Sequence, residues 1–151
     1  MSTITVHGEK VISRPIRVVQ SQFVDMARHA SAGVHADLNV SNVRPKEGGC
    51  LVTGRRRVLG MLQEDEIEVL RDSNGNSTLR SLSGTNAGLL ITQRFEALGL
   101  EKTRVHTTVE YPVRGLLRML SPLLRIGLQR DLATALEEDR IDLEERGYTE
   151  S

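Results

Sequence analysis

The chain of 151 residues balances 20 basic against 20 acidic side chains and contains only 3% aromatic residues. This balance argues against a dedicated nucleic-acid-binding domain, which is normally basic, and no apolar run approaches the ~20 residues of a membrane span. A single cysteine, Cys50, and a start without a charged and then apolar leader favour the reducing cytoplasm. We therefore expect one domain over residues 1–151, with an aliphatic core and no stable membrane insertion.

The N-terminal third begins with a strand and continues as a helix. Residues 3–13 are rich in β-branched side chains, which is typical of a β-strand. Pro15 then occupies a position that a first helical turn accepts, and apolar residues recur at helical spacing over 16–28. The following stretch, 29–36, is compatible with either a second short helix or a loop.

From Leu38 onward the hydrophobic period shortens to two, which is typical of strands. Glycine and asparagine turns separate six predicted strands, at 38–44, 50–59, 63–71, 78–84, 88–98 and 102–112. In the last two strands one face is mostly apolar, and it carries Leu89, Ile91, Gln93, Phe95, Val105, Thr107, Val109 and Tyr111. An antiparallel sheet covered on one side only produces this alternation.

The C-terminal segment predicts the element that covers the sheet. Leucines recur mostly at steps of three and four, at positions 117, 120, 124, 128, 132, 136 and 143. Ser121 and Pro122 suit a helix start, so we predict a short turn at 115–120 and a helix over 122–146, about 37 Å long. The predicted class is α+β, in the order strand, short helix, six strands, long helix.

Four segments carry a resemblance to a known family: residues 79–84, 93–98 and 102–111, and the Ser-Pro-Leu-Leu of 121–124. In them the chain resembles the START-like superfamily, in particular its polyketide cyclase/dehydrase and lipid-transport branch. The resemblance implies a helix-grip fold, in which a curved sheet of about seven antiparallel strands wraps around a long C-terminal helix. It also implies a cavity between sheet and helix for lipids, polyketides or other apolar molecules. The run 25–29 departs from the acidic turn and tryptophan that are common in the family.

The expected ligand site lies between the last two strands and the helix. Its residues are Ile91, Gln93, Phe95, Val105, Thr107, Val109, Leu120, Leu124 and Gly127. Gly127 costs about 1 kcal/mol of helix stability relative to alanine, and it leaves space where the family has its cavity. Close packing of helix on strand is the equally weighted alternative. Gln93 and Thr107 are the polar members, and either orients a ligand or bonds a neighbouring side chain.

Ionisable residues offer few further candidates. The four histidines show neither metal-ligand spacing nor a carboxylate partner in register, so we expect no metal and no cofactor. His29 and His35 flank the region where the family often gates its pocket, and both are kept as candidate ligand contacts, His35 as a member of the predicted site. The arginines of the run 55–57 alternate between the two faces of their strand. Either the arginines of one face pair with acids of the next strand, or an inward arginine such as Arg57 anchors the anionic head group of a ligand.

Three classes of function remain from the sequence. The leading hypothesis is binding or carrying of a small hydrophobic ligand, because no nucleophile and base stand in a catalytic pattern. The alternative is an enzyme of the polyketide cyclase/aromatase type, which needs inward acid and base groups. The third is binding of a protein partner, against which the polar outer face of the sheet argues. No nucleic-acid partner is expected, and three arginines among the leucines of 114–125 could touch a membrane surface or an anionic ligand.

Overall fold

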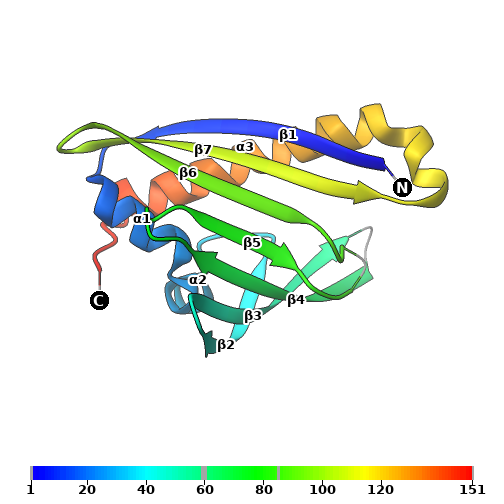
Figure 1. The fold of residues 1–151 in the computed structure, drawn as a ribbon, viewed down its shortest axis with the longest axis horizontal. Helices are drawn as coiled ribbons and strands as arrows, with labels where there is room; N and C mark the ends of the chain where they lie inside the picture. The colour runs from blue at the N-terminus through cyan, green and yellow to red at the C-terminus, as the bar shows by residue number, and fades with distance from the viewer. Residues whose placement is uncertain (1, 59–60, 85, 151) are drawn as a thin grey trace.

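A computed structural model of the chain describes residues 2–58, 61–84 and 86–150, with the backbone alone at 57, 58 and 61 (Figure 1). Its strands are β1 Ser2–Ile12, β2 Asn39–Lys46, β3 Gly49–Val58, β4 Met61–Arg71, β5 Ser77–Ser81, β6 Leu90–Gly99 and β7 Lys102–Val113. Its helices are α1 Ile16–Val24, α2 Met26–Ala32, the 3₁₀ turn η1 Gly115–Leu120 and α3 Ser121–Glu144.

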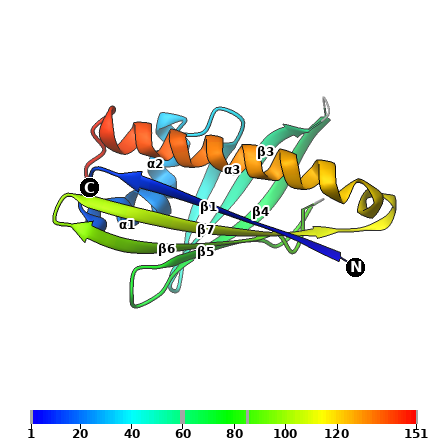
Figure 2. The same ribbon diagram turned by 90° about the horizontal axis from the view of Figure 1, so that it is seen from above.

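The seven strands form one antiparallel sheet in the order β1-β7-β6-β5-β4-β3-β2. Neighbours along the chain pair from β2 to β7, and β1 closes the order by pairing with β7, Val6 opposite Val109. Figure 2 shows α3 crossing the sheet on the side of β1, with α1 and α2 near its C-terminal end. The predicted α+β helix-grip class is confirmed, and so is the antiparallel pairing of the last two strands, Phe95 opposite Val105.

The interior is divided into two groups of buried apolar residues. The larger joins β1, β6, β7, α1 and α3, and it contains Val6, Phe23, Phe95, Val105, Leu132, Leu136 and Leu143 among others. The smaller lies under α2 on the other half of the sheet, and it contains Met26, Val40, Val52 and Val69. Aliphatic side chains dominate both groups, in agreement with the composition.

The first helical region differs from the single helix predicted over 16–28, because the helix breaks at Asp25. The Asp25 carboxylate accepts a hydrogen bond from the backbone N–H of Arg28 at 3.0 Å, which caps the start of α2. Gly33 then ends α2 in the left-handed conformation, with φ of 58°. The stretch after 29 is thus helix to Ala32 and loop beyond it.

The leucine stripe of the C-terminal helix is buried along only part of its length. Leu132, Leu136 and Leu143 lie in the core, and Leu124 and Leu128 are half-buried against it. Toward the N-terminus the same stripe is exposed, and 47% of Leu120 is accessible. The periodicity was a correct indication of helix, but in η1 and the first turn of α3 most of the leucine side chains are exposed.

Candidate functional site: an apolar concave face with an inward polar chain

The inner face of β3–β6 carries apolar surface that no helix covers completely. A hollow of about 110 Å³ lies there. It is lined by Leu38, Gly54, Arg56, Asp65, Ile67, Leu79, Ser81, Leu89 and Ile91. Leu89 and Ile91 are half-buried and also pack against the larger core, so the apolar surface continues from the core into the hollow.

The apolar residues expected to line the ligand site fall into two environments. Ile91 lines the hollow. Phe95, Val105 and Val109 lie instead in the larger core, where the Phe95 ring meets the Phe23 ring edge-on at 5.4 Å between centroids. The structure therefore brings one of these four residues to the hollow and packs the other three against α1 and α3.

The two polar residues of the predicted site both point inward. Gln93 accepts a hydrogen bond from the Ser77 hydroxyl at 2.7 Å, which joins β6 to β5. Thr107 is buried, and its hydroxyl oxygen has no hydrogen-bond partner among the described residues. A buried polar atom without a partner costs stability, but Thr107 lines neither the hollow of about 110 Å³ nor the larger one at the α1–α2 junction.

Of the C-terminal helix residues predicted to line the ligand site, Gly127 borders open space. Leu124 is half-buried against the core. A Cβ atom added at Gly127 would meet no atom within 4 Å in the described part of the chain. Open space therefore borders Gly127 itself, although Leu124 and Leu128 on either side of it pack against the core and no residue of α3 lines the 110 Å³ hollow.

The arginine run divides between the two faces of β3, as alternation requires. Arg55 forms an exposed ion pair with Glu64 of β4, with Nε 2.9 Å from the carboxylate oxygen. Arg56 points the other way and lines the hollow. The side chain of Arg57 lies outside the described part of the structure.

A chain of polar side chains reaches the hollow from the β5–β6 connection. The Asn86 amide donates to Asp65 Oδ2 at 3.1 Å, and the Tyr111 hydroxyl donates to Asn86 Oδ1 at 3.0 Å. Asp65 is 7% exposed, and its other oxygen, Oδ1, has no partner among the described residues. Alternation along β4 places Asp65 on the same inward face as Ile67 and Val69.

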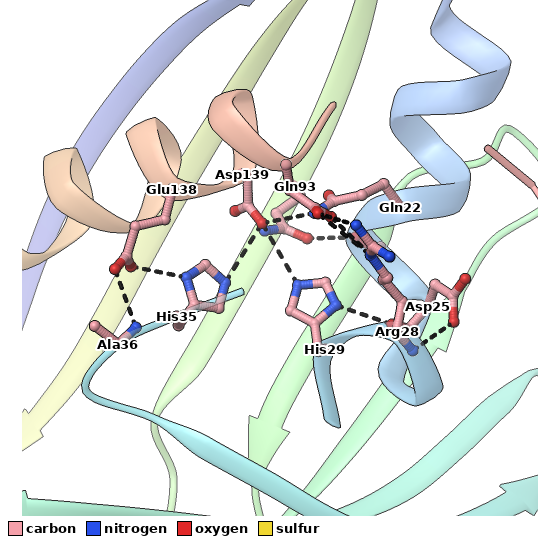
Figure 3. A network of polar contacts seen from close by, with 11 residues as sticks. Gln22, Asp25, Arg28, His29, His35, Ala36, Gln93, Glu138 and Asp139 are labelled. Carbon is pink, nitrogen blue, oxygen red and sulfur yellow. Dashed lines mark hydrogen bonds and ion pairs between the residues drawn. The ribbon is translucent and has the colours of Figure 1, made fainter. Parts of the chain in front are cut away.

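His29 and His35 lie in a polar cluster between α2 and α3 (Figure 3). His35 Nδ1 is 3.0 Å from Glu138 Oε1, and the Nε2 atoms of His35 and His29 are 3.4 and 3.5 Å from Asp139 Oδ1. Gln22 also donates to Asp139 Oδ1, at 3.1 Å. The sequence showed no carboxylate partner for these histidines, because their partners lie about a hundred residues further along the chain.

Electrostatics in this cluster favour the charged forms of His35 and Asp139. Burial opposes the charge of His35, but hydrogen bonds with Asp139 and Glu138 outweigh it and raise the pKa of His35 to about 9. Burial alone would raise the pKa of Asp139, whereas its hydrogen bonds with His29 and His35 lower it to about 2. His35 is thus engaged with α3 rather than free to contact a ligand in the 110 Å³ hollow.

A larger hollow, of about 430 Å³, lies where the α1–α2 junction faces the ends of β2, β3 and β4. Its lining includes Met26, Pro45, Cys50 and Val69. Burial raises the pKa of the Cys50 thiol, so the reactive thiolate is disfavoured there. This hollow is an apolar depression without an inward hydrogen-bonding chain comparable to that of Asp65.

Comparison with solved structures identifies the architecture. The chain superposes on the Zhui aromatase/cyclase from Streptomyces sp. R1128 with a TM-score of 0.77 and 15% identity, over 98% of this chain and 100% of that one. For a START superfamily protein from Mycobacterium smegmatis the TM-score is 0.69 and the identity 15%, over 92% of this chain and 98% of that one. For norcoclaurine synthase from Thalictrum flavum, in complex with dopamine and hydroxybenzaldehyde, the TM-score is 0.62 and the identity 13%, over 99% of this chain and 90% of that one.

The chain therefore has the START-like helix-grip fold, as the resemblance in its sequence implied. At these identities the likeness establishes the fold alone. No protein-family model and no curated protein matches the sequence. Among the described helices, none combines the length and the apolarity that crossing a membrane requires.

Proposed function

We propose that the protein binds a small hydrophobic molecule on the concave face of its sheet. The observation that carries this proposal is apolar surface that continues from the core to Leu79, Leu89 and Ile91 around an unfilled hollow. Ligand sites are typically concave and mostly apolar, with a few polar groups that orient the ligand. Two solved structures with this fold support the proposal: one is described as an aromatase/cyclase, and the other as a norcoclaurine synthase in complex with dopamine and hydroxybenzaldehyde.

The polar groups of the hollow define the ligand further. Asp65 Oδ1 is an acceptor without a partner among the described residues, and Arg56 lines the same hollow. A ligand with an apolar body and a hydroxyl or keto group would bury its body against Ile67, Leu79 and Ile91. Its hydroxyl would donate to Asp65, or its carbonyl would accept from Arg56. The ligand site then extends toward Leu124 and Gly127, where α3 borders open space.

Filling the hollow tests this proposal. A Cβ atom at Gly54 would lie 2.7 Å from the terminal methyl of Ile67, so Gly54→Val places side-chain volume in the hollow. Gly99→Val is the matched control, because a Cβ atom at Gly99 meets no described atom within 4 Å. We expect the wild type to bind an apolar fluorescent probe with one-to-one stoichiometry, and Gly54→Val to weaken binding at least about tenfold, or 1.4 kcal/mol.

The readouts are probe titration and native mass spectrometry of freshly purified protein, with circular dichroism to verify the fold. Gly99→Val should bind the probe as the wild type does. If Gly54→Val does not fold, Ile91→Phe fills the hollow from a half-buried position. A folded wild type that binds no probe and carries no co-purified molecule would contradict the proposal.

A second candidate is catalysis of the cyclase/aromatase type, favoured by the chain from Asp65 through Asn86 to Tyr111. Cyclisation of a poly-β-ketone requires removal of a proton next to a carbonyl, and the side chain of Asp65 lines the hollow where such a substrate would lie. Asp65→Asn should then abolish turnover of a poly-β-ketone substrate while leaving binding intact. Glu64→Gln, one residue away on the exposed face, is the matched control. Equal turnover by Asp65→Asn and wild type would rule this role out.

A further inference from the structure

Three ligand-type atoms converge between α2 and α3, away from the hollow described above (Figure 3). They are Nε2 of His29, Nε2 of His35 and Oδ1 of Asp139, and all lie within 4.8 Å of one another. The side chains of His29 and Asp139 are each 6% exposed, and that of His35 is 16% exposed. The three residues come from α2, from the loop after it, and from α3, so only the tertiary structure brings them together.

The Nδ1 nitrogen of each histidine ring already has a hydrogen-bond partner, and this partner fixes the direction in which Nε2 points. His29 Nδ1 is 2.9 Å from the backbone carbonyl oxygen of Asp25, which can only accept, so Nδ1 carries a hydrogen. His35 Nδ1 is 3.0 Å from the Glu138 carboxylate, which likewise requires a hydrogen on Nδ1. Nε2 of each ring is therefore the nitrogen that faces Asp139, and it becomes a metal ligand when its own hydrogen is displaced.

Without a metal, hydrogen bonds from the two rings to Asp139 hold the cluster together, and a metal ion bound there would replace those Nε2 hydrogens. Histidine side chains that bind metals characteristically donate their second nitrogen to a carbonyl or a carboxylate, which orients the ring. His29 uses a carbonyl and His35 a carboxylate in that way. The third ligand, the carboxylate of Asp139, is oriented from outside the cluster by Gln22, which donates to both Asp139 and Asp142.

We propose that His29, His35 and Asp139 form a binding site for a divalent transition-metal ion of the zinc class. The site is independent of the proposed ligand in the hollow. Imidazole nitrogens with one carboxylate suit zinc, which takes four ligands in a tetrahedron at about 2.0–2.1 Å.

Two of the three separations in the cluster fit such an ion, and the third, between the two nitrogens, is at most 4.8 Å. Two ligands of a tetrahedral zinc ion lie about 3.3–3.4 Å apart, a value that follows from those bond lengths. The two nitrogen-to-Asp139 separations are 3.5 and 3.4 Å. Bound there, the ion joins the α2 region to α3, and a fourth position remains for water or another small ligand.

The experiment uses untagged full-length protein, with Zn²⁺ and Co²⁺ as probes. Isothermal titration with Zn²⁺ should give one site per chain, and Co²⁺ should give the intense visible absorption of tetrahedral coordination. His29→Gln, His35→Gln and Asp139→Asn should each lower the affinity by about 100-fold or more. Glu138→Gln keeps all three ligands and removes only the group that orients His35, so it should cost about 10-fold.

A matched control is available on the outer face of the sheet. His106 lies 3.1 Å from both Glu9 and Glu96, so it also has two carboxylates but no second imidazole. His106→Gln should leave both titrations unchanged.

The proposal would be overturned if the folded wild type bound neither ion one-to-one, if the three ligand variants kept the wild-type affinity, or if His106→Gln lost binding. Asp139 is buried, so its variant can fail to fold. The wild-type titrations and the His35→Gln variant decide the question without it. A weak Co²⁺ spectrum, typical of six ligands, would also count against a tetrahedral site.

Discussion

The two halves of the C-terminal helical region have similar leucine content and very different surroundings. From Leu128 to Glu144, α3 packs on β1, α1 and α2, and Leu143 is completely buried. From Gly115 to Gly127, η1 and the first turns of α3 leave apolar side chains at the surface, and 67% of Leu123 is exposed. Hydrophobic periodicity predicts which face of a helix is apolar, but what lies opposite that face decides whether it is buried.

Polar contacts anchor α3 to the edge of the sheet near the point where the two halves meet. β1 pairs with β7 on one side only, so its outward carbonyls need other partners. Arg125 donates to the carbonyl of Thr5 at 2.6 Å, and Gln129 donates to the carbonyl of His7 at 2.7 Å. The helix thus covers an edge that would otherwise be free to pair with another chain.

Buried charges distinguish the C-terminal half further. Asp142 is almost completely buried, and its carboxylate pairs with the Arg28 guanidinium at 2.6 Å and accepts from Gln22 at 3.0 Å. Such pairs require their partners, because an unpaired buried charge is strongly destabilising. The C-terminal half is therefore fixed in position by both apolar and polar contacts, and the following substitutions test that difference.

The largest effect is expected for Leu143→Ala. The side chain of Leu143 is 0% exposed, so its truncation should lower the free energy of unfolding by about 2–5 kcal/mol, as measured by urea denaturation. Leu123→Ala on the exposed half is the control, and it should change that free energy by less than about 0.5 kcal/mol. Similar losses in both variants would show that the two halves do not differ in packing.

Gly8→Val tests the contact between β1 and α3. A Cβ atom at Gly8 would lie 2.8 Å from Leu132 and 3.1 Å from Leu136, so the larger valine side chain overfills the interface. We expect a loss of about 1–3 kcal/mol in the free energy of unfolding. The higher strand propensity of valine acts in the opposite direction, and a variant more stable than the wild type would show that the interface has room.

Gly127→Leu tests whether the ligand site reaches the exposed half of α3. A leucine there projects into open space, so the melting temperature should not fall. Binding of the apolar probe should weaken about tenfold, or 1.4 kcal/mol, if the ligand also contacts α3. Unchanged binding together with an unchanged melting temperature would confine the ligand to the hollow on β3–β6.

Gly127→Ala should produce the smallest effect, and in the stabilising direction. Alanine favours the helix over glycine by up to about 1 kcal/mol, and the added Cβ atom meets no described atom within 4 Å. Thermal unfolding measures the gain. A destabilised Gly127→Ala variant would mean that the space beside this glycine is occupied in solution.

The sequence by itself determined the elements and the class of fold. The shift of hydrophobic period near Leu38, the glycine and asparagine turns, and the leucine spacing after Ser121 predicted seven strands and a long helix, and the structure has them. These features are local, because the period of two or of 3.6 residues follows from the geometry of each element alone. The predicted inward faces of β6 and β7 are confirmed for the same reason.

Only the tertiary structure decided which inward residues line a hollow and which form the core. Phe95 and Val105 share a sheet face with Ile91, but α1 covers that end of the sheet and leaves Ile91 at the hollow. The pairing of His35 with Glu138 and the approach of Asn86 to Asp65 join residues 103 and 21 positions apart. No local pattern encodes such contacts, because they depend on the curvature of the sheet and on the position that α3 takes across it.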